Sequence, residues 1–365
     1  MIKFLDLYQQ YQGIRQEMDA AIARVIQQSS FIGGEDAAAF EKEFGTFQQA
    51  THCVGVANGT DAIEIVLEAL ELAHGSEVIV PANSFIASSE AVTRSGHRVI
   101  FADVLQDTYT LDPADVVRRI TPKTRAIVAV HLYGQPCRMD ELTAICRTHN
   151  LKLIEDAAQA HGAEYKGHRV GTLGVAGTFS FYPGKNLGAY GDAGAITTND
   201  IDLALKCRMI ANHGRTGKYD HRFEGRNSRL DGLQAAVLRV KLRHLDNWIE
   251  RRNRIAAIYG DGLAGLRGLA LPMIEAGTRH AFHLYVVRTE KREQLAKFLA
   301  ECEIQTGVHY PIALPKLQAY TYLGQDKEPM FANRADSTLL SLPMGDHLSD
   351  ADARAVIQAV RRFFE

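Results

Sequence analysis

The sequence predicts an α/β protein with a mostly parallel sheet, because short β-branched runs alternate with amphipathic helical segments between about residues 50 and 200. Several of the runs are apolar almost throughout, as strands covered on both faces are. The predicted strands are 53–56, 77–80, 98–102, 125–131, 152–155, 178–181 and 195–198. The predicted helices are 61–72, 86–94, 113–120 and 139–149. Asp112 before Pro113 is a typical helix start, and Gly96 fits just past a helix end.

After residue 228 the pattern changes to long helices in which charged residues are frequent, so each is expected to have one solvated face. Further strands and helices then mix in a smaller α+β arrangement. The predicted elements are helices near 230–245, 248–259, 292–302 and 351–364 and strands 283–288 and 304–309. We therefore expect a large α/β domain of residues 1–245 and a small α+β domain of residues 246–365, with residues 1–12 packing on the small domain.

Composition excludes several classes of protein. The 365 residues are 46% hydrophobic and 23% charged, an ordinary globular mixture. With 41 Lys and Arg against 43 Asp and Glu, the formal charge of −2 gives no basic surplus for nucleic acid. The five cysteines are scattered and form no disulfide or metal-site pattern, so no metal is expected. No window approaches the roughly 20 apolar residues of a membrane helix. The expected protein is cytoplasmic and has no membrane partner.

Residues 260–265 match the dinucleotide pattern Gly-x-Gly-x-x-Gly. That pattern binds a pyrophosphate only where a strand leads into it and a helix follows. Here it follows a predicted helix and leads into Leu-Arg-Gly. We interpret residues 260–265 as a loop. The alternative is a nicotinamide oxidoreductase, and this pattern is the only feature of the sequence that supports it.

Residues 57–62 (Ala-Asn-Gly-Thr-Asp-Ala) end a predicted strand and open a helix. Free N–H groups and the positive end of the helix dipole make such a turn an anion site. Gly59 lets the backbone approach the anion closely, and the Thr60 hydroxyl adds a donor. The alternative is a capped strand-to-helix turn without a ligand.

Residues 154–162 (Ile-Glu-Asp-Ala-Ala-Gln-Ala-His-Gly) follow another strand. Asp156 at the carboxyl end of a buried parallel strand is expected to point into the crevice where such folds bind ligands. A charged carboxylate there needs a cationic partner, and a protonated ring nitrogen of a cofactor would serve. The alternatives are a helix N-cap for Asp156 and a core or turn histidine for His161.

Residues 178–188 (Thr-Phe-Ser-Phe-Tyr-Pro-Gly-Lys-Asn-Leu-Gly) place Lys185 in a small-residue loop after an apolar strand. An amine whose solvation is reduced there has a lowered pKa, which suits imine formation with an aldehyde. Ser180 is a candidate phosphate donor. The alternative is a surface lysine with its charge in water.

Taken together, the three segments supply what pyridoxal phosphate needs, namely a lysine, an acid for the pyridinium nitrogen and a phosphate cup at a helix N-terminus. Phe85 follows a further predicted strand end and supplies an aromatic face for the ring. Four candidate residues each follow a predicted strand, in the order Gly59, Phe85, Asp156 and Lys185. Such an arrangement is difficult to obtain by accident. The sequence thus predicts a pyridoxal-phosphate site.

These motifs resemble the DegT/DnrJ/EryC1/StrS family of pyridoxal-phosphate aminotransferases, which act on nucleotide-linked keto-sugars. The resemblance extends from Phe-Leu-Asp-Leu at 4–7 through the three segments to Asn-Ser-Arg-Leu-Asp-Gly-Leu-Gln-Ala-Ala at 227–236. It implies the fold-type I architecture, with a mostly parallel mixed sheet in the large domain. Family members that dehydrate sugars have histidine in place of the lysine, so Lys185 implies transamination.

The resemblance also implies roles for single residues. Lys185 bonds to the cofactor aldehyde and moves the proton, and Asp156 pairs with the pyridinium nitrogen. Gln159 hydrogen-bonds the phenolic oxygen, and Phe85 stacks on the ring. The phosphate is held by Gly59, Thr60 and Ser180. Asn227 reaches the phosphate from a neighbouring subunit, which implies a homodimer with shared active sites.

The implied amino donor is L-glutamate, which leaves the cofactor as pyridoxamine phosphate. The loop 181–194 resembles the branch that acts on C3 of a dTDP-3-keto-6-deoxyhexose. The implied sugar-binding residues are Tyr182, Arg229, His309 and Tyr310. A 4-keto-sugar or a UDP-2-acetamido-3-keto-uronic acid is an alternative acceptor, and a non-catalytic binding protein on the same fold is a further alternative.

Overall fold

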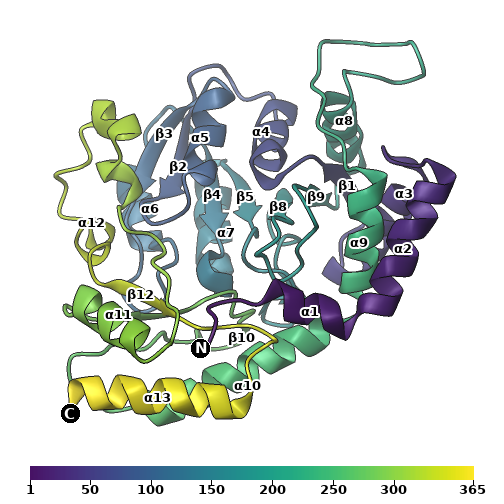
Figure 1. Cartoon of the computed structure of the whole chain (residues 1–365). Helices are drawn as coiled ribbons and strands as arrows, with labels where there is room; N and C mark the ends of the chain where they lie inside the picture. Colours follow the sequence, from purple (N-terminus) through teal and green to yellow (C-terminus); the bar gives the residue numbers. More distant parts are fainter.

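The computed structural model describes all residues, 1–365, and its centre is a seven-stranded sheet with the order β1-β9-β8-β5-β4-β2-β3 (Figure 1). Only β9 runs antiparallel to its neighbours. The sheet's strands are β1 His52–Val56, β2 Glu77–Pro81, β3 Arg98–Ala102, β4 Thr124–Val130, β5 Lys152–Asp156, β8 Ala176–Ser180 and β9 Gly194–Thr198. The predicted α/β class with a mostly parallel sheet is confirmed.

The elements predicted between residues 50 and 200 are confirmed, and the strand ends differ from the prediction by no more than two residues. The helices there are α4 Gly59–Ala69, α5 Ala87–Arg94, α6 Pro113–Arg119 and α7 Met139–His149. Asp112 caps α6, since its side chain accepts a 2.9 Å hydrogen bond from the Ala114 N–H. Gly96 has φ +79°, a left-handed conformation that suits a residue just past a helix end.

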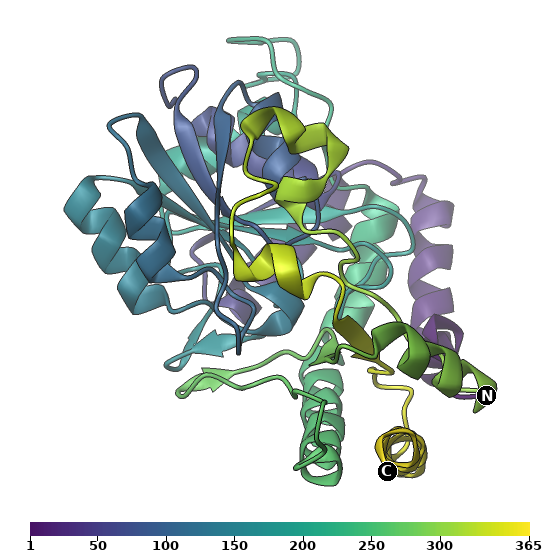
Figure 2. The same ribbon diagram turned by 90° about the vertical axis from the view of Figure 1, so that its left-hand side faces the viewer.

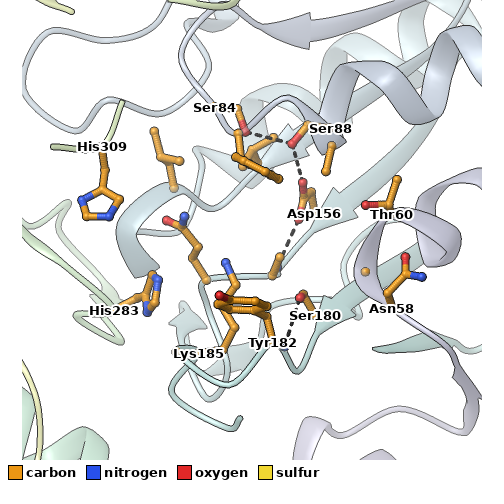
Figure 3. A pocket seen from close by; sticks show the side chains of 18 of the residues that line it. Asn58, Thr60, Ser84, Ser88, Asp156, Ser180, Tyr182, Lys185, His283 and His309 are labelled. Carbon is orange, nitrogen blue, oxygen red and sulfur yellow. Dashed lines mark hydrogen bonds between the residues drawn. The ribbon is translucent and has the colours of Figure 1, made fainter. Parts of the chain in front are cut away.

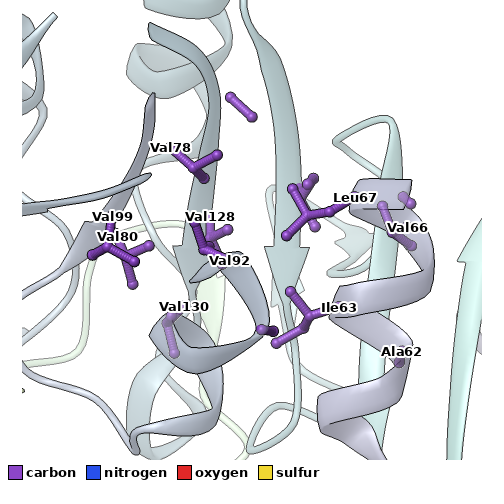
Figure 4. Close-up of a cluster of buried hydrophobic side chains, with 14 of the residues drawn as sticks. Ala62, Ile63, Val66, Leu67, Val78, Val80, Val92, Val99, Val128 and Val130 are labelled. Atoms are coloured by element: carbon purple, nitrogen blue, oxygen red, sulfur yellow. The ribbon is translucent and has the colours of Figure 1, made fainter. Parts of the chain in front are cut away.

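Both faces of the sheet are covered by helices, which is why its strands are apolar almost throughout. One face packs against α4, α5 and α8 (Ile201–Ala211), where Val78, Val128 and Ile63 belong to one buried cluster (Figure 4). The opposite face contributes Ile79 and Ile127 to a second cluster. Burial of each such side chain stabilises the fold by about 1.5–3 kcal/mol.

The remaining elements frame this sheet. The helices are α1 Leu7–Gly13, α2 Arg15–Gln28, α3 Gly34–Gln48, α9 Gly232–Leu242 and α12 Phe331–Ala335, and the short 3₁₀ turns are η1 Leu132–Gly134, η2 Leu314–Lys316 and η3 Gln318–Leu323. The strands β6 Glu164–Tyr165, β7 His168–Arg169 and β10 Thr278–Arg279 form a small separate sheet in the order β10-β6-β7.

The C-terminal segments have their own apolar cluster. It is built on α10 Leu245–Leu263, β11 Tyr285–Arg288, α11 Arg292–Glu301, β12 Leu339–Leu342 and α13 Asp350–Phe364. Ser349 and Asp352 form a capping box at the start of α13. The N-terminus lies beside these segments, because Ile2 exchanges backbone hydrogen bonds with Glu303 (2.7 Å) and Gln305 (3.0 Å) (Figure 2).

Two details of the prediction need correction. Residues 304–309 are not a strand, because only isolated bridges from Ile304 and Gly307 form there. The segment 260–265 is not a loop throughout, since α10 continues to Leu263. A Cβ on Gly262 would lie 2.5 Å from Ile357 Cδ1, so this glycine allows α10 to pack closely on α13. No helix of the chain is long and apolar enough to span a bilayer.

Candidate active site

A cavity of about 880 Å³ opens at the carboxyl edge of the sheet. It is lined by residues at or after the ends of five strands, β1, β2, β4, β5 and β8, and by N-terminal and C-terminal segments (Figure 3). The cavity brings together the predicted cofactor residues Gly59, Thr60, Phe85, Asp156, Gln159, Ser180 and Lys185. It also contains three of the predicted sugar-binding residues, Tyr182, His309 and Tyr310.

One side of the cavity is formed by the N-terminus of α4. The Asn58 side chain caps the helix by accepting a 2.8 Å hydrogen bond from the Asp61 N–H, so the N–H groups of Gly59 and Thr60 are the ones left without a partner at this helix end. Gly59 packs directly on Ser180, since a Cβ at residue 59 would lie 2.6 Å from the Ser180 Cβ. The two predicted phosphate-binding segments therefore meet at the positive end of a helix dipole.

Asp156 ends β5 and is 5% exposed. Its carboxylate accepts hydrogen bonds from the Ser88 hydroxyl at 2.6 Å and from the Ala158 N–H at 3.1 Å. Ser88 is itself 2.8 Å from the Ser84 hydroxyl, so a short hydroxyl chain fixes the carboxylate (Figure 3). No Lys, Arg or His of the chain forms an ion pair with Asp156, which leaves this acid free for a cation bound in the cavity.

Lys185 lies in the loop after β8, where its backbone N–H donates a 2.8 Å hydrogen bond to the Tyr182 carbonyl. Burial lowers the pKa of the Lys185 amine to about 8, although the nearby Asp156 charge acts in the opposite direction. About a tenth of this amine is therefore neutral at pH 7, far more than for a lysine with the ordinary pKa. A neutral amine is the form that attacks an aldehyde.

Gln159 connects the cofactor residues with the predicted sugar residues. Its amide accepts a 2.6 Å hydrogen bond from the Tyr133 N–H and donates a 3.0 Å hydrogen bond to the Tyr310 hydroxyl. Tyr310 in turn packs on Phe85, with ring centroids 5.7 Å apart. Phe85 is 54% exposed, so much of its ring remains accessible to a planar ligand.

His309 lies on the opposite side of the cavity from Asn58 and Thr60 (Figure 3). Its Nδ1 is 2.9 Å from the Ser341 hydroxyl, and its ring stacks on Phe4 at 5.7 Å. Burial and the Lys185 charge lower the pKa of His309 to about 4. The imidazole is therefore neutral at physiological pH and can offer hydrogen bonds without a charge.

Two predicted residues do not reach this cavity within one chain. Asn227 is exposed and Arg229 half-buried, and neither lines the cavity. Both belong to the segment 212–231 between α8 and α9, part of which extends away from the body of the molecule in Figure 1. Asn227 is predicted to act from a neighbouring subunit and Arg229 to bind the sugar, and both stay predictions.

Sequence reasoning missed several residues of the cavity. Ser88 follows β2 by only a few residues, so the rule that led to Phe85 could have found it. His283 precedes β11 and Arg252 lies within α10, and neither position carries a local signal. Arg252 is 2% exposed, although the helix that carries it is rich in charged residues.

The residues present fit pyridoxal phosphate. An unpaired buried carboxylate, a lysine with a lowered pKa and an open helix N-terminus converge on one cavity. Together with the mostly parallel sheet, they define a pyridoxal-phosphate-dependent transferase of fold type I.

The comparison with known proteins assigns the family. Residues 12–361 match the model of the DegT/DnrJ/EryC1/StrS aminotransferase family, and the chain belongs to this family. It is 45% identical to the dTDP-3-amino-3,4,6-trideoxy-alpha-D-glucose transaminase of Streptomyces venezuelae, over 100% of this chain and 96% of that protein. It is 39% identical to the UDP-2-acetamido-2-deoxy-3-oxo-D-glucuronate aminotransferase of Pseudomonas aeruginosa, over 99% of both chains.

A solved relative has the same fold over its whole length. The crystal structure of S. venezuelae DesV in complex with a ketimine intermediate superimposes with a TM-score of 0.97 at 44% identity, covering 100% of this chain and 98% of that one. The protein is accordingly a sugar aminotransferase, and its cofactor is pyridoxal phosphate, with pyridoxamine phosphate as the aminated form.

Proposed function

We propose that the enzyme transfers the amino group of L-glutamate to C3 of a dTDP-linked 3-keto-6-deoxyhexose. The observation that carries the reaction type is the convergence of Lys185 and Asp156 on one cavity. The name of the S. venezuelae relative, a dTDP-3-amino-sugar transaminase, supports the nucleotide and the carbon position. The cavity volume of about 880 Å³ accommodates a substrate of this size beside a cofactor.

The chain's own residues have distinct parts in this proposal. Bound pyridoxal phosphate supplies an electron-accepting ring that stabilises the carbanion formed at the substrate carbon. Asp156, fixed by Ser88, keeps the positive charge on the ring nitrogen. Lys185 Nζ, once free, carries the proton between substrate carbon and cofactor carbon. Phe85 stacks on the ring and Gln159 hydrogen-bonds its phenolic oxygen.

The phosphate and the sugar occupy opposite sides of the cavity. Gly59, Thr60 and Ser180 hold the phosphate at the N-terminus of α4. Tyr182, His309 and Tyr310 contact the sugar. Arg229 contributes from the neighbouring subunit, because within one chain it does not line the cavity.

The proposal includes a homodimer with shared active sites, in which Asn227 reaches the phosphate of the partner's cofactor. Exposure of Asn227 in the single chain and the projecting segment that carries it support this (Figure 1). Tyr8, Tyr182 and Ile32 are exposed apolar side chains of the kind that subunit interfaces cover. The large domain is proposed to end near residue 245, and the enzyme to act in the cytoplasm, where its five cysteines stay reduced.

A UDP-2-acetamido-3-keto-uronic acid is the second candidate acceptor. The P. aeruginosa relative is named for such a substrate, and the cavity contains a buried arginine that suits a carboxylate. A 4-keto-sugar has no observation in its favour. A non-catalytic protein would be expected to lack Lys185 or Asp156, and both are present.

The test is a visible absorption titration of the protein supplemented with pyridoxal phosphate. We expect a band from the protein-bound cofactor that a dTDP-3-amino-6-deoxyhexose perturbs and the 4-amino isomer does not. If only the 4-amino isomer perturbs the band, the enzyme is still a sugar aminotransferase, but it aminates C4 instead of C3. Absence of any protein-bound cofactor band would contradict the role of Lys185.

A further inference from the structure

Arg252 is a buried cation in the wall of the active-site cavity. It belongs to α10, is 2% exposed, and lines the same cavity as Lys185. Arg252 is the one charged residue among the buried side chains of α10, and the others are aliphatic apart from Tyr259. A guanidinium stays protonated even when it is buried, so this position places a fixed positive charge beside the reaction site.

The hydrogen bonds of Arg252 leave one edge of the guanidinium without a partner. Nη1 donates to the backbone carbonyls of Phe282 at 3.0 Å, His283 at 3.3 Å and Met344 at 3.4 Å. Nε is buried and has no hydrogen-bond partner. Nη2 also makes no hydrogen bond within the chain, and it is not buried as Nε is, so Nη2 is the nitrogen that can donate to a ligand in the cavity.

No acid of the chain neutralises Arg252. The nearest relevant charge is that of Asp346, which lies beyond ion-pair distance and accepts a 3.1 Å hydrogen bond from Gln10 instead. The adjacent Arg251 contrasts with this, since it forms a 2.7 Å ion pair with Asp350. A buried charge without a counter-ion is costly, which indicates that the counter-ion arrives with a ligand.

The other basic groups of the cavity are not available as a positive charge for a ligand. Lys185 is reserved for the cofactor, and Arg94 is paired with Glu64 at 2.8 Å. Burial lowers the pKa of His283 well below its usual value and that of His309 to about 4, so both rings are neutral near pH 7. Apart from Lys185, Arg252 is the one cation of the cavity lining that forms no ion pair with an acid.

We propose that Arg252 binds a carboxylate of the substrate through Nη2. The proposal rests on the aminotransferase function, because transamination brings two carboxylate sources to this cavity. One is the amino-acid donor, which carries two carboxylates. The other is C6 of a uronic-acid acceptor. In either case Arg252 contributes substrate affinity and selectivity, and the carbonyls of residues 282, 283 and 344 hold it in place.

The first experiment measures binding without reaction. Glutarate carries both carboxylates of glutamate but no amino group, so it cannot be turned over. Its dissociation constant for the cofactor-loaded enzyme is measured by calorimetry for wild type, Arg252→Gln and Arg252→Lys. A hydrogen-bonded charge pair contributes about 1.5–3 kcal/mol, so Arg252→Gln is expected to weaken glutarate binding about 10–100-fold. Arg251→Gln is the matched control, with an unchanged dissociation constant.

The second experiment identifies the carboxylate. Conversion of the loaded enzyme to its pyridoxamine-phosphate form is followed with L-glutamate, with 4-aminobutyrate, which lacks the α-carboxylate, and with L-2-aminobutyrate, which lacks the γ-carboxylate. In Arg252→Gln the efficiency with glutamate falls about 10–100-fold. The analogue that lacks the contacted carboxylate is unaffected. If both glutarate binding and the amino-acid reactions are unchanged while only a UDP-keto-uronic acid reacts more slowly, the carboxylate comes from the sugar.

An equal loss with all amino acids and sugars, at unchanged glutarate affinity, would overturn the proposal and leave Arg252 a structural residue. Arg252→Lys keeps the charge, so it guards against a variant that simply fails to fold. Failure of the proposed function looks different, because the wild-type enzyme itself would then not react with any amino acid. The glutarate measurement still tests Arg252 in that case.

Discussion

The two sides of the cavity are built in different ways. The side with Asn58, Asp156 and Lys185 comes from loops that directly follow strands of the large sheet, and its two reactive groups have opposite charge (Figure 3). The side with Arg252 and His309 comes from a helix interior and from a turn between distant elements. From this comparison we expect the strand ends to determine the reaction, and segments assembled from the C-terminal third to determine substrate selection.

The largest effect is expected at the strand ends. Lys185→Ala removes both the amine that bonds to the cofactor and the group that moves the proton, and we expect turnover to fall at least about 10⁴-fold. Far-ultraviolet circular dichroism should be unchanged, because Lys185 makes no side-chain hydrogen bond in the chain. Turnover within tenfold of wild type would contradict the role of Lys185, and with it the difference between the two sides of the cavity.

Asp156→Asn tests the second group on the same side. The amide cannot neutralise a protonated ring nitrogen, so turnover is expected to fall about 10²–10³-fold, as for loss of one preorganised electrostatic contact. Steady-state rates with both substrates measure this.

Glu155 provides the matched control for Asp156, because it precedes it on β5 and is equally buried. Its carboxylate faces His131 at 3.0 Å and the N–H groups of Gly171 and Leu173, each at 2.7 Å, rather than the cavity. Glu155→Gln should lower the free energy of unfolding by about 1–3 kcal/mol while turnover stays close to wild type. If Asp156→Asn lowers stability and Glu155→Gln lowers the rate instead, then Glu155 and not Asp156 is the acid that pairs with the ring nitrogen.

The same contrast explains what the sequence could predict. The strand ends were predictable because a parallel sheet brings the residues after its strands to one edge, so Gly59, Asp156 and Lys185 could be placed together from local patterns. Arg252 could not be placed this way. Its helix is rich in charge, and only packing against the turns at 282–283 and 344 decides which arginine turns inward.

The C-terminal elements were also harder to predict for a physical reason. Residues 304–309 have strand-like composition, yet Ile304 bridges to Ile2 and Gly307 to Ser341, so two different partners divide the segment and no ladder forms. Ile2 lies about 300 residues from its partner, and Ser341 lies 34 residues from its own, so neither bridge leaves a trace in local periodicity. Asn227 and Arg229 do not line the cavity of the single chain, and the contacts that a second copy would give them lie outside any pattern within this one.

A smaller effect is expected on the sugar side. His309→Ala removes a neutral hydrogen-bonding group and the ring that stacks on Phe4. The KM for the keto-sugar should therefore rise about tenfold, as for loss of one hydrogen bond. The half-reaction with L-glutamate should keep its rate, and stopped-flow measurement of each half-reaction separates the two. Equal losses in both half-reactions would show that His309 supports the whole cavity instead of the sugar.

The smallest effect concerns pH and the rate at which the apoenzyme takes up cofactor. Because the pKa of Lys185 is about 8, its neutral fraction grows about tenfold between pH 6 and 7 and approaches its limit above pH 8. The uptake rate should follow this curve. The groups that face Lys185 are Asp156, His161, His283 and His309, and the three imidazoles are neutral throughout because their pKa values are lowered.

Two variants decide whether this pH profile belongs to Lys185. The Asp156 charge raises the pKa of Lys185, so in Asp156→Asn the midpoint should move to lower pH. Lys241 is the control, because burial lowers its pKa to about 8 as well while its amine donates to the Gly188 carbonyl at 2.7 Å, outside the cavity lining. A midpoint that shifts in Lys241→Met but not in Asp156→Asn would assign the titration to Lys241. It would also show that the chemistry at the strand ends responds to a lysine behind the loop.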